Sequence, residues 1–285
     1  MAVKLGRVGV WAMELRSGGK EAGARAAAEA EKLGYGAIWT PGGIDDQVLG
    51  DVDNLLDATS TAVIGTGIIN VWKQPAEDVG AWFAPQSADR KARTMLGLGI
   101  SHGPLIGDSY GKPIENMSAY LDRLDKAGVP KGNRCLAALG PKMLDLAADR
   151  TAGSHPYLVP VEHAAVARKR MGPDALLAPE VGVVLETDPD KARAMARDAV
   201  SFYLTLPNYV NNWRRLGYSE EDVKGSDKLI DALFAWGEPK KIAERINAHL
   251  DAGADHVCIQ VIRADMMNVT APPVDEWRTL AKALF

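Results

Sequence analysis

An apolar segment of β character followed by an amphipathic or alanine-rich segment recurs along the whole 285-residue chain. Segments such as VIGTGIINVW (63–72) and MLGLGIS (95–101) are apolar without alternation, which is typical of strands buried on both faces of a parallel sheet. The expected strands are residues 6–12, 37–40, 63–72, 93–101, 134–140, 154–159, 177–186 and 256–262. The expected helices are residues 20–34, 52–60, 75–88, 113–128, 141–151, 161–172, 188–204, 239–253 and 274–284.

Eight strand–helix units in a chain of this length predict an α/β fold of the (β/α)8 TIM-barrel type, with residues 1–285 as a single domain. An open doubly wound sheet would carry a dinucleotide-type glycine fingerprint at its first turn. The first turn here reads WAMELRSGG (11–19) and lacks that fingerprint. The pattern therefore favours the closed barrel.

Charge and apolar content exclude several classes of partner. The formal net charge is −4 with both signs interspersed, so no basic stripe is available for nucleic acid and no polybasic patch for a membrane. No run of about 18 apolar residues occurs, and the first residues lack a secretory leader pattern, so we expect a cytoplasmic protein. Cys135 and Cys258 each lie in an apolar run, which predicts buried thiols and no metal site.

Residues 206–238 interrupt the regular alternation of strands and helices between the seventh and eighth expected strands. They predict a helical insertion. Ser226 is a plausible helix cap within it. Insertions of this kind usually lie over the carboxyl ends of barrel strands. Tyr209 and Trp213 are therefore candidates for contact with a substrate, and the alternatives are packing onto the barrel or a homodimer interface.

Candidate site residues follow the third and fourth expected strands. Glycines at 97 and 99 let a flat ligand approach the backbone, and Ser101 and His102 begin the next loop. Asn70 follows the glycine at position 67 in the neighbouring strand. The alternatives are a bend or bulge of the strand and a solvated histidine.

The step Gly140-Pro141-Lys142 connects the fifth strand to a helix. Proline suits the first helical turn, and the N–H groups of residues 142–144 would point out of the helix start. Such donors, together with the lysine charge, predict a site for a phosphate. A tight turn with a solvated lysine is the alternative.

Residues 135–197, beginning CLAALGPKMLDLAADRTAGSHPYLV, resemble the luciferase-like monooxygenase superfamily, in its branch of F420 (deazaflavin)-dependent oxidoreductases of actinobacterial type. LGRVGVWAMEL, GTGIINVWKQPAEDV, LGLGISHGPLIGDSYGKPIENMSAYLDRLD, LPNYVNNWRRLGY, GSDKLIDALFAWG and AGADHVCIQVI extend the resemblance over nearly the whole chain. It implies a barrel with an insertion that transfers a hydride between F420 and a small organic substrate, and we expect a homodimer. FMN is the alternative cofactor.

The resemblance also implies roles for individual residues. Gly67 and Ile68 match a strand bulge, often with a non-proline cis peptide, that backs the cofactor ring, and Trp11 would pack near that ring. The residues implied to bind the remainder of the cofactor are Asn70, Gly99, Ser101, His102, Ala138, Gly140, Pro141, Lys142 and Met143. Tyr157 would face the substrate.

One departure from the family pattern concerns the acid that commonly follows the second strand. Gly42 and Gly43 stand at that place here. Either His102 therefore takes over proton transfer, or the protein binds its cofactor with little or no activity. The sequence does not determine the substrate, the choice between F420 and FMN, or the oligomeric state.

Overall fold

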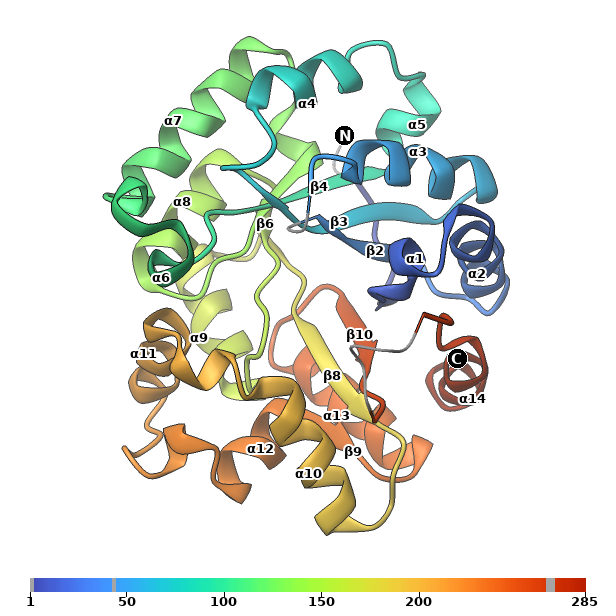
Figure 1. The fold of residues 1–285 in the computed structure, drawn as a ribbon, viewed down its shortest axis with the longest axis vertical. Helices are drawn as coiled ribbons and strands as arrows, with labels where there is room; N and C mark the ends of the chain where they lie inside the picture. The colour runs from blue at the N-terminus through green and yellow to red at the C-terminus, as the bar shows by residue number, and fades with distance from the viewer. Residues whose placement is uncertain (1–2, 43–44, 265–269) are drawn as a thin grey trace.

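The computed structural model describes residues 3–42, 45–264 and 270–285, and it shows a sheet of parallel strands curled into a barrel (Figure 1). The strands are β1 (Val8–Trp11), β2 (Ala37–Gly42), β3 (Val63–Asn70), β4 (Thr94–Gly99), β5 (Arg134–Leu136), β6 (Gly153–Ser154), β7 (Leu176–Leu177), β8 (Glu180–Val184), β9 (Phe234–Trp236) and β10 (Val257–Val261). Their order is β7-β6-β5-β4-β3-β2-β1-β10-β8-β9. The predicted barrel architecture is confirmed.

The two sides of the sheet meet because β7 and β8 are consecutive in the chain, separated by Ala178 and Pro179 alone. The Ala178 N–H donates to the Ser154 carbonyl oxygen at 2.9 Å, and the Cys258 N–H donates to the Pro179 carbonyl oxygen at the same distance. The sequence predicts one strand over residues 177–186. Pro179 has no N–H to contribute to the ladder, and the strand is divided there.

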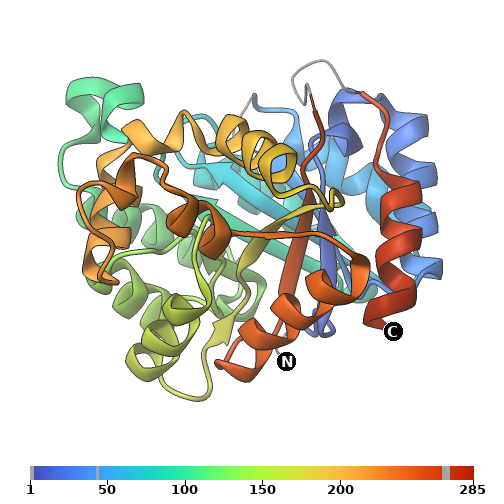
Figure 2. The same cartoon turned by 90° about the horizontal axis from the view of Figure 1, so that it is seen from below.

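Helices surround the sheet on its outer face (Figures 1 and 2). They are α1 (Glu14–Ser17), α2 (Lys20–Lys32), α3 (Val48–Ala58), α4 (Ala76–Phe83), α5 (Ala88–Ala92), α6 (Gly103–Ile106), α7 (Pro113–Lys126), α8 (Pro141–Arg150), α9 (Val161–Met171), α10 (Pro189–Val200), α11 (Pro207–Arg215), α12 (Asp227–Leu233), α13 (Pro239–Asp251) and α14 (Val274–Leu284). The single helix predicted over 75–88 is two helices, with Pro85 between them.

Alternate residues of the strands point into the barrel and form a small apolar cluster there. Trp39 lies at its centre, and its indole stacks on the His155 ring with centroids 4.0 Å apart and planes 5° apart. Gly65 makes room for this indole, since a Cβ atom at that position would lie 2.4 Å from it. Cys135 and Cys258 are buried free thiols in the same cluster, as predicted.

A second apolar cluster lies under residues 203–233, the segment between α10 and β9 that contains α11 and α12. The Ser226 hydroxyl accepts a hydrogen bond from the Leu229 N–H at 3.3 Å, which confirms the predicted cap of α12. β9 follows this segment and pairs with β8, with Gly182 opposite Phe234. Sequence reasoning missed β9, because its three residues are too short to show a period.

No helix among the described residues is long and apolar enough to cross a membrane.

Candidate functional site

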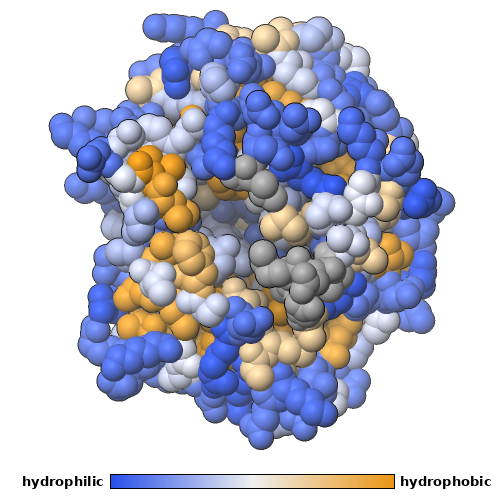
Figure 3. Space-filling view, in the orientation of Figure 1, coloured by the Kyte–Doolittle hydropathy of each residue, from blue (hydrophilic) through white to orange (hydrophobic). Residues whose placement is uncertain are grey.

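A cavity of about 940 Å³ lies at the carboxyl ends of the strands, where TIM barrels place their active sites. Figure 3 shows a hollow in the middle of this face, with apolar side chains beside it. Its lining includes inward-facing residues of several strands or of the segments that follow them, namely Trp11, Gly67, Gly99, His155, Tyr157, Glu180 and Gln260. Residues of α10 and α11 complete the opposite wall, among them Ala199, Asn208 and Tyr209.

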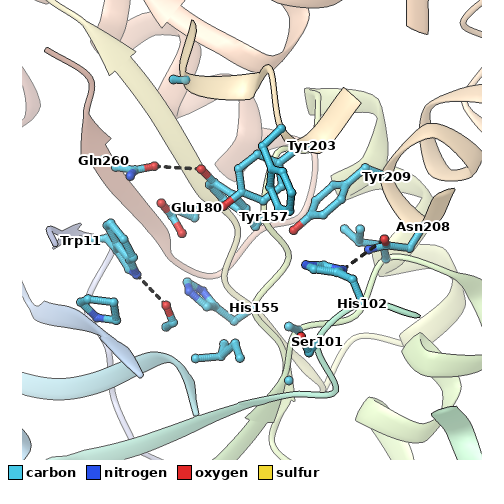
Figure 4. A pocket seen from close by; sticks show the side chains of 18 of the residues that line it. Trp11, Ser101, His102, His155, Tyr157, Glu180, Tyr203, Asn208, Tyr209 and Gln260 are labelled. Carbon is cyan, nitrogen blue, oxygen red and sulfur yellow. Dashed lines mark hydrogen bonds between the residues drawn. The ribbon is translucent and has the colours of Figure 1, made fainter. Parts of the chain in front are cut away.

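Glycines keep one wall of this cavity flat. A Cβ atom at Gly67 would lie 2.5 Å from the Trp11 indole nitrogen, and one at Gly99 would lie 2.4 Å from the Ile68 side chain. The Trp11 indole N–H donates to the Gly67 carbonyl oxygen at 3.0 Å (Figure 4). The Gly67–Ile68 peptide bond is cis. Backbone and indole therefore form a surface on which a planar ligand fits.

Gly42 explains why an acid is absent at the end of β2. A Cβ atom there would lie 2.8 Å from the Ile68 carbonyl oxygen, so the backbones approach too closely for a side chain. Gly43 lies outside the described residues. Asn70, at the end of β3, uses its side-chain oxygen to accept the Trp72 N–H at 3.0 Å while it lines the cavity.

His102 lies between β4 and α6, and α11 holds its ring. The His102 Nδ1 atom is 3.2 Å from the Asn208 side-chain oxygen (Figure 4). Burial lowers the pKa of His102, and the bond to Asn208 opposes that shift. Since the amide oxygen only accepts, this bond requires the proton on Nδ1 and leaves Nε2 as an acceptor. Ser101, next to it, adopts a left-handed conformation with φ 60°.

Three tyrosines pack edge to face beside the cavity (Figure 4). The ring centroids of Tyr157 and Tyr203 are 5.1 Å apart, and so are those of Tyr203 and Tyr209. The Tyr157 hydroxyl donates to the Gln260 side-chain oxygen at 3.3 Å. Burial raises the pKa of Tyr157 and of Tyr209 well above the ordinary value. This wall therefore presents neutral aromatic rings and hydroxyl groups.

Two buried groups in the cavity escape sequence reasoning. Glu180 is 5% exposed, and its Oε1 atom has no hydrogen-bond partner among the described residues. His155 is 2% exposed, its Nδ1 atom lies 2.7 Å from the Ala178 carbonyl oxygen, and its Nε2 atom has no partner in the described structure. Burial raises the pKa of Glu180 well above its usual range and lowers that of His155 to about 4. The signal in the sequence that could have identified Glu180 is a single glutamate within the apolar run LLAPEVGVV.

The start of α8 lies between this cavity and a second one of about 530 Å³. Gly140 and Met143 line the first cavity, and Pro141 lines the second. The Met143 and Leu144 N–H groups donate to the Gly140 carbonyl oxygen at 3.1 and 3.0 Å. The expectation that the N–H groups of 142–144 all point outward is therefore wrong for two of them, because the first turn closes on Gly140.

Arg215 of α11 supplies a cation at this helix start that sequence reasoning did not assign. Its guanidinium would lie 3.5 Å from a Cβ atom at Gly140. It donates to the Asn212 side-chain oxygen at 3.4 Å, and no carboxylate among the described residues forms an ion pair with it. Burial lowers the pKa of this guanidinium. A cation that lines the cavity and has no carboxylate partner within the described part of the chain suits an anionic ligand.

The predicted site residues divide into two groups. Those that line the main cavity are Trp11, Gly67, Ile68, Asn70, Gly99, Ser101, His102, Gly140, Met143, Tyr157 and Tyr209. Those that do not are Ala138, Pro141, Lys142 and Trp213. Ala138 is buried in the core, whereas Lys142 is exposed. Trp213 is fully buried and donates its indole N–H to the Leu158 carbonyl oxygen at 3.0 Å, so the expected substrate contact is wrong for this residue.

No group of three His, Cys, Asp or Glu side chains within the described ranges could hold a metal ion.

Solved structures of other proteins share this fold over nearly their whole length. An F420-dependent secondary alcohol dehydrogenase in complex with an F420–acetone adduct superposes with a TM-score of 0.72 at 14% identity, covering 98% of both chains. The F420-dependent tetrahydromethanopterin reductase of Methanopyrus kandleri gives 0.67 at 16% identity, covering 98% of this chain and 97% of its own. The oxygenating constituent of 3,6-diketocamphane monooxygenase from Pseudomonas putida, in complex with FMN, gives 0.66 at 13% identity, covering 100% and 98%.

No protein-family model matches the chain, and no curated protein matches its sequence. The comparisons therefore show the fold. This fold is the barrel that the sequence resemblance implies.

Proposed function

We propose that this chain is an F420-dependent oxidoreductase of the luciferase-like superfamily, which transfers a hydride between the deazaflavin and a small organic substrate. The observation that carries the proposal is the cavity over the strand ends, with a flat wall at Gly67 and Gly99 and an aromatic wall opposite. Two structures that share the fold over at least 97% of each chain are F420-dependent enzymes. Large apolar cavities with a few placed polar groups are typical of cofactor sites.

The chain's own residues fit such a cofactor. In our proposal the ring system lies against Gly67, Ile68 and Gly99, with Trp11 beside it, because these positions offer backbone and indole instead of bulky side chains. The phosphate lies at the start of α8, where the Lys142 N–H, the Lys142 side chain and Arg215 gather positive charge. Asn70, Ser101 and Met143 complete the contacts.

The bound cofactor supplies or accepts the hydride. The protein binds and orients the cofactor and the substrate, and it excludes water from them. His102 holds its proton on Nδ1 and offers Nε2 as an acceptor, so in the free protein at neutral pH it serves as a base or hydrogen-bond acceptor. Tyr157 and Tyr209 face the space left for a substrate. We include residues 206–238 in this proposal as the predicted insertion, which covers the substrate through Tyr209 and is anchored through Trp213.

Two alternatives follow from the same cavity. An FMN-dependent monooxygenase is favoured by the fold shared with the FMN-bound camphane monooxygenase constituent. A cofactor-binding barrel with little or no activity is favoured by the close approach of Gly42 to Ile68, which leaves no room for the acid expected after β2. The homodimer and the cytoplasmic location stay predictions.

Titration of the protein with F420 and with FMN, followed by the cofactor's absorbance and fluorescence, tests the proposal. We expect saturable binding of F420 that is at least about tenfold tighter than binding of FMN, a difference of about 1.4 kcal/mol. Reduced F420 should then be oxidised under nitrogen when substrate is present. Tighter binding of FMN with uptake of oxygen would move the assignment to the monooxygenase, and binding without any turnover would leave a carrier.

A further inference from the structure

Glu180 begins β8 and holds an ionisable group inside the cavity, with no counter-charge beside it among the residues that the structure describes. Its N–H donates to the Pro156 carbonyl oxygen at 2.9 Å, and its backbone pairs with Cys258 of β10. Cys258, its partner on β10, belongs to the cluster inside the barrel, so Glu180 points to the same side. Figure 4 shows its carboxyl group in the space bounded by Trp11, His155, Tyr157 and Gln260.

The groups that face this carboxyl are uncharged. They come from the segment after β6, from β10 and from the region of α10 and α11, and they are His155, Tyr157, Tyr203, Tyr209, Cys258 and Gln260. Two cations line the cavity elsewhere. Arg263 is paired with Glu14 at 2.5 Å, and Arg215 lies at the start of α8. Burial raises the pKa of Glu180 well above the usual range, which favours the protonated carboxyl.

We propose that Glu180 is the proton donor of this cavity, and that the substrate is a small compound with an uncharged carbonyl group. This inference rests on the proposed function. A buried neutral carboxyl with a free oxygen is a donor for an oxygen atom that gains negative charge. A substrate carboxylate at this position would be an anion without a cation to pair it, which is costly in a buried site.

The reaction balances in the direction of reduction. The carbonyl carbon accepts the hydride of the reduced deazaflavin, the C=O π electrons move to oxygen, and that oxygen takes the proton from Glu180. The substrate is reduced by two electrons to an alcohol, and the deazaflavin is oxidised by two. Glu180 is left as a carboxylate and regains its proton from water when product leaves.

In this proposal Glu180 is the acid, and His102 has a different role. The His102 ring donates from Nδ1 to Asn208, and its burial disfavours a second proton. The same reasoning applies to His155. Its Nδ1 atom lies beside the Ala178 carbonyl oxygen and carries the proton, so its Nε2 atom is an acceptor. Among the described lining residues, Glu180 is the carboxyl deepest in the barrel, while Asp198 of α10 lies at the opposite wall.

The first test needs no substrate. Infrared spectra of wild type, recorded without and with F420 between pH 5 and 8, are compared with those of Glu180→Gln and of Glu244→Gln, a matched change at an exposed position of α13. We expect the carbonyl stretch of a protonated carboxylic acid to persist at pH 7 in wild type and Glu244→Gln, and to be absent in Glu180→Gln. Disappearance of the band in wild type as the pH is raised from 5 to 7 would overturn the proposal.

The second test uses reduced F420 with acetone and cyclohexanone as uncharged probes and pyruvate as a charged one. We expect turnover of a ketone, a kcat lowered by about 100-fold or more in Glu180→Gln, unchanged F420 affinity and no effect of Glu244→Gln. Failure to bind F420 would overturn the proposed function and leave the infrared result standing. Binding of F420 with turnover of pyruvate alone, or a Glu180→Gln rate equal to wild type, would overturn this inference.

Discussion

The Nδ1 atom of His102 and the side-chain oxygen of Asn208 lie 3.2 Å apart, although the residues are 106 positions apart in the chain. This bond joins the loop after β4 to α11 across the mouth of the cavity. The Tyr209 ring packs on the same histidine, with centroids 5.6 Å apart. The segment of residues 203–233 is thereby held against the barrel at the edge of the proposed site.

Replacement of this partner by Asn208→Ala should lower the pKa of His102 further, because the bond opposes the effect of burial. It should also reduce the free energy of unfolding by about 1 kcal/mol, the usual net contribution of one hydrogen bond. Titration of the histidine ring by NMR gives the pKa, and urea unfolding gives the free energy. Asn54→Ala, which removes an exposed amide bond to the Lys20 carbonyl oxygen, is the control and should leave the His102 titration unchanged.

Arg215 should contribute more to phosphate binding than Lys142. Arg215 lies beside Gly140 and lines the cavity, whereas Lys142 does not line it and is exposed to solvent that screens its charge. We expect Arg215→Gln to weaken F420 binding by about tenfold at low salt and Lys142→Ala by less than about threefold. Fluorescence titrations at two salt concentrations measure both. Arg214→Gln, next to it but paired with Glu220, is the matched control, and equal losses in all three variants would contradict the assignment.

Gly140 allows a sharper test of the same region. A Cβ atom there would meet the Arg215 guanidinium at 3.5 Å, which is ordinary contact. Gly140→Ala should therefore bind F420 within about twofold of wild type, whereas the branched side chain of Gly140→Val should displace the guanidinium and lower affinity by about tenfold or more. The two titrations are made side by side. Strong binding by Gly140→Val would place the phosphate elsewhere.

Acid should destabilise the protein through its buried histidines. Burial lowers the pKa of His155, His163 and His256 to about 4, and that of His249 to about 3. Each folded pKa is below the unfolded value of about 6.5, so the unfolded chain binds the extra protons. The neutral histidines make their full contribution to the free energy of unfolding above pH 6.5. This contribution is lost as pH falls toward 4, by up to roughly 3 kcal/mol for each histidine.

Glu180 acts with the opposite sign. Its folded pKa is above the unfolded value of about 4.3, so its contribution declines as pH rises above that value. Four histidines outweigh this one carboxyl below pH 6.5, and we expect the urea midpoint to fall steadily from pH 7 to pH 5. Glu180→Gln should steepen that fall by removing the opposing group. A midpoint independent of pH over this range would contradict both assignments.

Substitutions at Trp213 and Tyr209 should distinguish an effect on stability from an effect on substrate binding. Trp213 is fully buried, and Trp213→Ala should lower the free energy of unfolding by about 3–5 kcal/mol. Tyr209→Phe keeps the packed ring and removes the hydroxyl at the cavity, so it should change ketone KM or kcat while unfolding stays within about 1 kcal/mol of wild type. Unfolding curves, kinetics and size-exclusion chromatography measure both variants. Dissociation into monomers with unchanged substrate affinity would make the segment an oligomer interface.

The alternation of strands and helices was readable from the sequence because it is a local property. Apolar runs without alternation indicated strands buried on both faces, and Gly140-Pro141 and Ser226 marked helix starts that the structure contains. Even the errors at helix and strand boundaries have local causes, such as Pro85 and Pro179. These features depend on neighbours along the chain, so one sequence was enough to determine the barrel.

The meeting of distant side chains was decided by the tertiary structure alone. Glu180 comes to lie beside Tyr157 and Gln260 only when β8 pairs with β10 and reaches the segment after β6. Arg215 reaches Gly140 only when α11 packs over the strand ends. Inward orientation depends on strand register, since a shift of one residue would turn Glu180 outward. Register is fixed by long-range packing, and no local pattern in a single sequence encodes it.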